Sequence, residues 1–302
     1  MTYNTDVSTG AGAAPMIPPV VGGSPEEVAD GVFVIPDGRV PLVPNVGIVV
    51  GERAALVVDT GIGPRNGAVV LEAAGELTGD RSLFLTLTHF HPEHGFGAQE
   101  FLEAATIVYD REQHEEFRQK ARPYLDMFRG FGGVVAEQLE GVEFVDPHVV
   151  YGGADLDLGG KVVQLRSWGT AHSRGDQTVW LPDERALFTG DLVKNRFFPI
   201  FSFFPPLDTD VDGGGWIGVL DELERLEPEI VVPGHGEISD AGAIAAVRGY
   251  LALLRDETRR LASEGNDTDE IVAALEPRMR ELHPDWDMPQ WIALGVRSFL
   301  AE

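Results

Sequence analysis

One short segment of the chain, residues 89–94, contains three imidazoles and one carboxylate in the order His-Phe-His-Pro-Glu-His. It directly follows the apolar run 83–88, a pattern typical of a buried β-strand that ends in a loop. Side chains alternate along an extended chain, so we expect His89, His91 and Glu93 on one side and His94 on the other. Two such sets of nitrogen and oxygen ligands suit two adjacent divalent metals better than one.

Histidine is scarce elsewhere in the chain. Only 8 of the 302 residues are histidine, so three within six positions favour a metal site over a chance cluster of solvated or core histidines. Three further candidate ligands, His172, Asp191 and His235, each lie where an apolar strand gives way to a glycine-containing loop. The remaining histidines lie in polar or helical contexts and are interpreted as surface or packing residues: His114, His148 and His283.

These motifs together resemble the metallo-β-lactamase superfamily, and they occur in the family's order between residues 59 and 236. The resemblance implies that His89, His91 and His172 hold a first metal. It further implies that Glu93, His94 and His235 hold a second metal, that Asp191 bridges the two, and that Asp59 orients a ligand without binding metal. The matching segments are Asp59-Thr60-Gly61, residues 89–94, Ala171-His172-Ser173, Thr189-Gly190-Asp191 and Pro233-Gly234-His235-Gly236.

One position departs from the family pattern, which is usually His-x-His-x-Asp-His. This chain has Glu93 where the family has Asp. The extra methylene moves the carboxylate by more than about 1 Å, at a kind of site where ligand distances hold within about 0.2 Å. The first group of ligands is intact, whereas filling of the second group depends on how the loop accommodates Glu93.

Composition excludes several classes of function. The chain has no cysteine, so it has no disulfide, thiolate ligand or cysteine nucleophile. Its net charge of -26 disfavours nucleic acid and anionic membranes as partners. Residues 1–24 lack the cationic start and apolar core of a secretory signal, and no apolar run approaches the roughly 20 residues of a membrane span. We therefore expect a cytoplasmic protein.

The pattern along the chain predicts an α/β (α+β) protein. Residues 1–27 are predicted to be a flexible tail, and residues 28–302 a single domain with a helical C-terminal extension at 241–302. Two sheets inside two helical layers would form the four-layer αββα sandwich that the resemblance also implies. The expected strands are 46–50, 54–58, 162–165, 178–181 and 186–191; the expected helices are 66–77, 97–105, 216–226, 241–262, 269–282 and 289–300.

Two segments are predicted to lie near the metals. Residues 110–143 combine a charged helix at 111–122 with aromatic and glycine residues; they form either a surface helix packed on the core or a lid over the substrate. The second segment directly follows Asp191. Its cations Lys194 and Arg196 are interpreted either as surface charges or as partners of a substrate anion, and Phe197, Phe198 and Phe201 as an apolar pocket wall or as core.

The ligand set predicts a zinc-dependent hydrolase with two zinc ions, although iron or manganese also suits such ligands. A metal-bound hydroxide would attack an ester, thioester, lactone or amide bond of a small, largely apolar substrate, with Asp191 or Glu93 as the catalytic carboxylate that takes the proton. Two alternatives stay open: an iron-dependent oxygenase or thiol dioxygenase, and a non-catalytic binding protein with a damaged second site. The apolar faces of the C-terminal helices are read as packing or as a homodimer surface.

Overall fold

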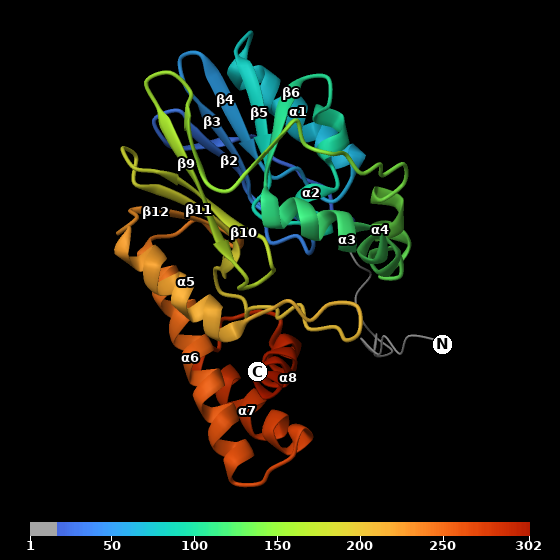
Figure 1. Cartoon of the computed structure of the whole chain (residues 1–302), viewed down its shortest axis with the longest axis vertical. Helices are drawn as coiled ribbons and strands as arrows, with labels where there is room; N and C mark the ends of the chain where they lie inside the picture. The colour runs from blue at the N-terminus through green and yellow to red at the C-terminus, as the bar shows by residue number, and fades with distance from the viewer. Residues whose placement is uncertain (1–16) are drawn as a thin grey trace.

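The computed structural model describes residues 17–302, and its centre is a pair of packed β-sheets (Figure 1). The first sheet has seven strands in sequence order from β1 to β7. Pairing is antiparallel from β1 to β4 and parallel from β4 to β7. Its strands are β1 (Glu26–Ala29), β2 (Val32–Ile35), β3 (Val46–Val50), β4 (Ala54–Val58), β5 (Ser82–Thr86), β6 (Ala105–Asp110) and β7 (Val149–Tyr151).

The second sheet has five strands in the order β12-β11-β10-β9-β8. Its pairs are antiparallel except for β11 and β12, which run parallel. The parallel pair places the ends of β11 and β12 at the same edge of the sheet, so side chains at both ends can meet. The strands are β8 (Ala154–Asp157), β9 (Val162–Gly169), β10 (Asp176–Leu181), β11 (Ala186–Lys194) and β12 (Ile230–His235).

Helices cover the outer face of each sheet, as Figure 1 shows. Helices α1 and α3 contact the seven-stranded sheet, and α6 contacts β11 and β12 of the other sheet. The N-terminal helices are α1 (Pro64–Thr78), α2 (Pro92–Gly95), α3 (Arg111–Arg129) and α4 (Gly133–Gln138), with the 3-10 turn η1 (Ala98–Phe101). The C-terminal helices are α5 (Gly213–Arg225), α6 (Ala241–Ser263), α7 (Thr268–Leu282) and α8 (Ile292–Ala301), with the turn η2 (Pro289–Trp291).

The core divides into three apolar clusters that follow these layers. The middle cluster joins the facing sides of the two sheets, for example Leu56 and Val58 of β4 with Val179 of β10 and Phe188 of β11. One outer cluster lies between the first sheet and helices α1 and α3, and the other between the second sheet and helices α5–α8. Helix, sheet, sheet and helix layers are therefore present in order, which confirms the predicted αββα sandwich.

The C-terminal helices α6, α7 and α8 form an orange-to-red lobe beside the second sheet (Figure 1). The sequence predicted helices at 241–262, 269–282 and 289–300, within two residues of the observed bounds apart from the first turn of the last one, which is the 3-10 turn η2. A capping box at Asp267 and Glu270 explains the sharp start of α7. Within residues 17–302, no helix is both long enough and apolar enough to cross a lipid bilayer.

Two predictions about local structure are wrong. The helix expected at 97–105 is only the short 3-10 turn η1, and the chain then enters β6. The run Ala105–Asp110 is rich in β-branched and aromatic residues, and its pairing with β5 overrides the helical pattern before it. The helix after Asp110 was also predicted to end at residue 122, whereas α3 continues through Pro123 to Arg129.

The flexible tail was predicted to include residues 1–27, but part of this segment already packs on the body of the protein. Residues 1–16 lie outside the described residues. Beyond them Val21 is 2% exposed, its backbone N–H donates to Asn66 Oδ1 at 2.6 Å, and β1 begins at Glu26. The side chain of Asn66 also donates to the carbonyl oxygen of Pro19 at 3.0 Å, so α1 holds this stretch against the body of the protein.

Candidate metal centre

Four segments carry the seven predicted ligands to one edge of the sandwich. Residues 89–94 follow β5, and His172 lies in the loop between β9 and β10. Asp191 lies in β11, and His235 is the last residue of β12, the parallel neighbour of β11. Strand β12 passes very close to β11: a Cβ atom added at Gly234 would lie only 2.1 Å from Asp191 Oδ1. Glycine at position 234 therefore lets the backbone of β12 pass directly beside the Asp191 carboxylate.

The seven side chains form two groups that share Asp191. One group contains His89, His91, His172 and Asp191; the other contains Glu93, His94, Asp191 and His235. In each group the candidate ligand atoms lie within 4.8 Å of one another. The structure therefore brings together all seven residues singled out in the sequence and divides them as the family resemblance implies.

The expected alternation of side chains along residues 89–94 is wrong beyond His91. It placed Glu93 with His89 and His91, whereas the structure groups Glu93 with His94. The reason is local: α2 begins at Pro92, a favourable first residue of a helix, so the chain stops being extended there. Neighbouring helical residues then carry Glu93 and His94 together to the second group.

Several buried ligand atoms have no hydrogen-bond partner among residues 17–302. They include Glu93 Oε2, His94 Nε2, His235 Nε2 and Asp191 Oδ1, while Asp191 Oδ2 forms an ion pair with Lys194. Leaving such atoms unpaired in a protein interior costs about 1–3 kcal/mol each, so a cluster of them needs a reason. A divalent cation in their midst would satisfy all of them at once.

The spacing of these atoms fits tetrahedral metal coordination. Metal–nitrogen bonds of 2.0–2.1 Å place two ligand atoms roughly 3.3 Å apart. The distances to the Asp191 carboxylate are 3.4 Å from His94 Nε2, 3.5 Å from His235 Nε2 and 3.6 Å from His172 Nε2. The donor set thus fits the two-metal site that the fold family implies, with nitrogen and carboxylate oxygen ligands suited to zinc, iron or manganese.

Each of the five histidines has a partner for the ring nitrogen that faces away from the cluster. Such outer contacts fix the ring orientation and the tautomer of a metal-binding histidine. His94 Nδ1 lies 2.8 Å from Asp59 Oδ2, His89 Nδ1 lies 3.1 Å from Thr88 Oγ1, and His235 hydrogen-bonds the backbone of Val43. His91 Nε2 lies 3.3 Å from Ser202 Oγ, and His172 Nδ1 lies 3.1 Å from the carbonyl oxygen of Ile200.

Asp59 is the most connected of these outer partners. Its carboxylate accepts the backbone N–H of Thr88 at 2.7 Å and the Thr88 hydroxyl at 2.9 Å, in addition to its contact with His94. Asp59 holds a positive φ of 69°, a conformation that aspartate tolerates better than most residues. Its geometry is that of a carboxylate that orients a ligand, the role the family resemblance implies for it.

The protonation of the site favours ligation by neutral imidazole. Burial lowers the pKa of His89, His91 and His235 well below the usual range and that of His172 to about 4. Burial opposes charge on His94 as well, but the carboxylates of Asp59 and Asp191 raise its pKa to about 10. Metal ligands must be deprotonated, so four of the five histidines already carry the form that binds.

Comparison with known proteins agrees with this geometry. The sequence profile described as the metallo-beta-lactamase superfamily matches residues 39–235, about two thirds of the chain. The chain belongs to the metallo-beta-lactamase superfamily. A curated relative, the beta-lactamase-like protein 2 homolog of Caenorhabditis elegans, is 23% identical over 190 residues, which cover 63% of this chain and 54% of the relative.

Solved structures show the same superfamily fold. The sec-alkylsulfatase Pisa1 from Pseudomonas sp. superimposes with a TM-score of 0.71 at 16% identity, over 91% of this chain and 49% of that protein. A metallo-beta-lactamase from Pontibacter korlensis gives a TM-score of 0.57 at 20% identity, over 76% of this chain and 98% of that protein. The chain thus spans about half the length of the curated relative and of the sulfatase. The superfamily sandwich is the shared feature in each case.

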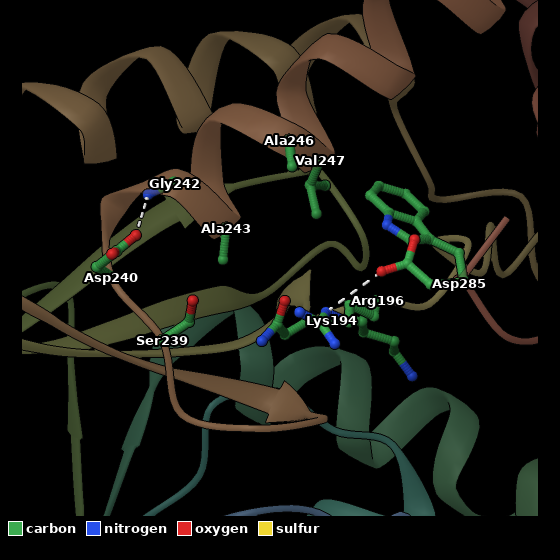
Figure 2. A pocket seen from close by; sticks show the side chains of 11 residues that line it. Lys194, Arg196, Ser239, Asp240, Gly242, Ala243, Ala246, Val247 and Asp285 are labelled. Carbon is green, nitrogen blue, oxygen red and sulfur yellow. Dashed lines mark hydrogen bonds and ion pairs between the residues drawn. The ribbon is translucent and has the colours of Figure 1, made fainter. Parts of the chain in front are cut away.

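The two cations predicted near the metal centre, Lys194 and Arg196, differ in their distance from the candidate ligands. Lys194 ends β11, is 4% exposed, and its Nζ lies 2.5 Å from Asp191 Oδ2 and 5.2 Å from the centre of the Trp291 ring. Arg196 is exposed and lies 3.5 Å from the Asp285 carboxylate. Both line a cavity of about 190 Å³, in which Ala243, Ala246 and Val247 of α6 lie opposite them (Figure 2). Lys194 therefore lies between the Asp191 carboxylate and this cavity.

The three phenylalanines predicted as a pocket wall lie in or beside the core. Phe198 is fully buried against Tyr250 and Trp286, and Phe201 is fully buried against Trp216 and Phe299. The pocket-wall interpretation is wrong for these two, because helices α5–α8 cover the segment. Phe197 is 8% exposed, and the Arg39 guanidinium lies 4.4 Å above its ring.

The segment 110–143 packs its aromatic residues on the core. Tyr124 and Phe128 of α3 are buried in the apolar cluster beneath the first sheet, and Phe131 is exposed. This agrees with the surface-helix interpretation of the sequence; a lid movement remains a prediction. No pattern in the sequence indicated that the ring of Tyr124 lies on a predicted ligand: its centre is 5.3 Å from the centre of the His91 ring.

Proposed function

We propose that the protein is a metal-dependent hydrolase that uses a dinuclear site to cleave an ester, thioester, lactone or amide bond of a small, largely apolar substrate. The observation that carries this proposal is the pair of ligand groups joined at Asp191, with four buried ligand atoms that have no partner within residues 17–302. Two zinc ions are the expected metals, with iron or manganese as alternatives for the same donors.

Divalent metals held by these ligands would polarise the bond to be cleaved and lower the pKa of water to about 7. The chain itself would supply orientation and proton transfer. His89, His91 and His172 would present neutral nitrogens from fixed rings, and Asp191 would hold the two groups at a constant separation. No serine or cysteine nucleophile is required for such chemistry.

Glu93 is the better proton acceptor of the two candidate carboxylates. Burial raises the pKa of Glu93, and its Oε2 atom has no hydrogen-bond partner in the described part of the chain. Although burial acts on Asp191 too, the ammonium of Lys194 and the imidazoles of His235 and His94 hold its pKa well below the usual range. A carboxylate with a raised pKa keeps a proton more readily, so the Glu93 carboxylate would hold the proton on the oxygen that does not bind metal, before the leaving group takes it.

The substrate must be small at its reactive end, because none of the seven ligand residues is more than 7% exposed. Carbonyl esters, thioesters and lactones are the first candidates. A secondary alkyl sulfate belongs in the same panel, since the sec-alkylsulfatase superimposes on 91% of this chain. That likeness concerns the fold, so it supports including the compound and ranks no substrate above another.

The first experiment is elemental analysis of protein purified without added metal or chelator, followed by a hydrolysis panel. About two zinc ions per chain and turnover of one panel compound would support the proposal. Iron together with a visible absorption band would favour the oxygenase alternative. A chain that neither contains metal nor takes up added zinc would contradict the enzyme function altogether.

The role of the nearby cations has its own test. If Arg196 meets an anionic group of the substrate, Arg196→Ala should raise KM and leave kcat nearly unchanged, because Arg196 contacts no candidate ligand. Lys194→Ala should change both constants, since Lys194 also pairs with Asp191. Unchanged KM in both variants would remove these two residues from the substrate site.

A further inference from the structure

Helix α3 carries a stripe of buried polar residues on the side that faces the metal centre. Glu116, Lys120 and Tyr124 are spaced four residues apart, so they lie on one face of the helix. Their side chains are nearly inaccessible: Glu116 is 0% exposed, Lys120 7% and Tyr124 1%. Lysine and glutamate are rarely buried unless they are paired, so this stripe requires partners.

The partners come from the loop after β11. Lys120 Nζ donates to Glu116 Oε1 and to Asp208 Oδ1, both at 2.6 Å, and lies 2.9 Å from Asp210 Oδ2. The hydroxyl of Tyr124 donates to the other oxygen of Asp208 at 2.6 Å. Although burial disfavours its charge, Glu116 and Asp208 raise the pKa of Lys120, so the ammonium stays protonated. The buried side chains of the network thus pair with one another, and several of them are charged. Charge-assisted hydrogen bonds of 2.6 Å are stronger than hydrogen bonds between neutral groups.

One end of the network touches His91. The rings of Tyr124 and His91 are stacked, with centres 5.3 Å apart and planes 27° apart. The loop that contains Asp208 also contains Ser202, whose hydroxyl lies 3.3 Å from His91 Nε2. His91 is therefore held on one face by a ring that Asp208 tethers, and at its outer nitrogen by the same loop.

The other end of the network holds the loop of His172. Glu116 Oε2 accepts the backbone N–H groups of Arg174 and Gly175, each at 3.1 Å. Gly175 passes so close to α3 that a Cβ atom there would lie 2.3 Å from the Cα of Gln113. Arg174 and Gly175 follow His172 by two and three residues, so these hydrogen bonds hold the His172 loop against α3.

We propose that Glu116, Lys120, Tyr124 and Asp208 form a positioning network that sets the geometry of His91 and His172, and through them the metal affinity of the first ligand group. This inference rests on the proposed metal-binding function. Within residues 17–302, the hydrogen bonds and the ring contact of the network include none of Glu93, His94 and His235. Loss of one of its hydrogen bonds should therefore weaken the first metal and leave the second unchanged.

A purely structural role makes a different prediction. If the network only anchored α3 to the loop at Asp208, breaking it would lower the melting temperature and leave metal affinity as it was. The test must therefore measure the two groups separately. The His235→Ala background leaves the first group complete and removes one ligand of the second, and His89→Ala does the reverse.

The test variant is Tyr124→Phe, which removes a single oxygen and keeps the ring. Its matched control is Tyr250→Phe, because Tyr250 is also fully buried but its hydroxyl has no partner among the described residues. Cobalt would be titrated into each protein against a competing chelator, with the visible absorption of bound cobalt as a second readout. Melting of the metal-free proteins would show that each variant is folded; Asp208→Asn replaces Tyr124→Phe if that variant is not.

In the His235→Ala background, Tyr124→Phe should raise the cobalt dissociation constant about tenfold, the lower end of the range for outer partners of metal ligands. The shape of the cobalt spectrum should change with it. In the His89→Ala background the constant should not move, and Tyr250→Phe should affect neither. Equal cobalt affinity with and without the Tyr124 hydroxyl, or an equal loss of affinity in Tyr250→Phe, would overturn this inference but leave the proposed function standing. Failure of the parent protein to bind cobalt would overturn the proposed function and the inference together.

Discussion

The two ligand groups differ in how tightly their atoms are gathered. In the first group His91 Nδ1 lies 2.9 Å from His89 Nε2 and 3.1 Å from His172 Nε2. In the second, Glu93 Oε2, His94 Nε2 and His235 Nε2 have no partner within residues 17–302, and both imidazoles lie 3.4–3.5 Å from Asp191. The first group is thus a compact cluster of imidazoles, whereas the second is an open set of atoms around a shared carboxylate.

Their surroundings differ in charge as well. The outer partners of the first group are neutral oxygens of Thr88, Ser202 and Ile200. The second group contains Glu93 and is held by the charged Asp59. Ligands in the first group depend on shape and packing; those in the second depend on carboxylates. Substitutions that remove a charge other than that of the shared Asp191 should therefore separate the two groups.

Asp191→Asn should have the largest effect, because Asp191 belongs to both groups. The amide keeps the volume but removes the shared negative charge, so both metals should bind more than about 100-fold more weakly, beyond the range for outer partners. Elemental analysis after dialysis would show fewer than one metal per chain. The same exchange at Asp267, the N-cap of α7, is the control and should leave two. Retention of two metals by Asp191→Asn would mean that the groups do not share this ligand.

Asp59→Asn should come next and act mainly on the second group. Asparagine tolerates the positive φ of this position, so the backbone should stay in place. The amide has one acceptor oxygen for the three contacts that the carboxylate receives from Thr88 and His94. We expect a 10- to 100-fold weaker second metal, measured by chelator competition, with a smaller change in the first. An equal loss in both groups would show that Thr88 transmits the effect to His89.

Much of this centre could be predicted from residue order alone. Strand-to-loop transitions with glycine mark the positions of His172, Asp191 and His235, and the spacing within residues 89–94 identifies the rest. The division into two groups followed from the family resemblance and not from side-chain alternation. Pro92 starts a helix there, and a helix presents Glu93 and His94 to one region where a strand would separate them.

The outer contacts could not be predicted, because they depend on the path of irregular segments. Ser202 and Ile200 meet His91 and His172 across a loop with no repeating pattern, and Asp208 meets Lys120 at a separation of 88 residues. Phe198 and Phe201 followed a ligand directly and suggested a pocket wall. Their burial is decided by α5–α8, which come later in the chain and cover them.

Glu93→Asp tests whether the second group is built for glutamate. The glutamate carboxylate already lies among the second-group atoms, so shortening it should move the oxygen away from them by more than about 1 Å. We expect roughly tenfold weaker binding of the second metal in cobalt titrations, with the first unaffected. Glu93→Gln, which keeps the length but not the charge, is the companion variant. Tighter binding or new activity in Glu93→Asp would instead identify the parent site as damaged.

Ser202→Ala should have the smallest effect and act on the first group alone. The variant removes one neutral contact of 3.3 Å at the outer nitrogen of His91, and such a hydrogen bond contributes about 0.5–1.5 kcal/mol. The first metal should therefore bind roughly 2- to 10-fold more weakly in the same titrations, while the second is unchanged. Ser298→Ala in α8 is the control, since that serine is also buried and, within residues 17–302, forms no hydrogen bond with a candidate ligand. A loss from Ser202→Ala as large as that from Asp59→Asn would reverse the comparison, because the imidazole group would then depend on its outer partner as strongly as the carboxylate group does.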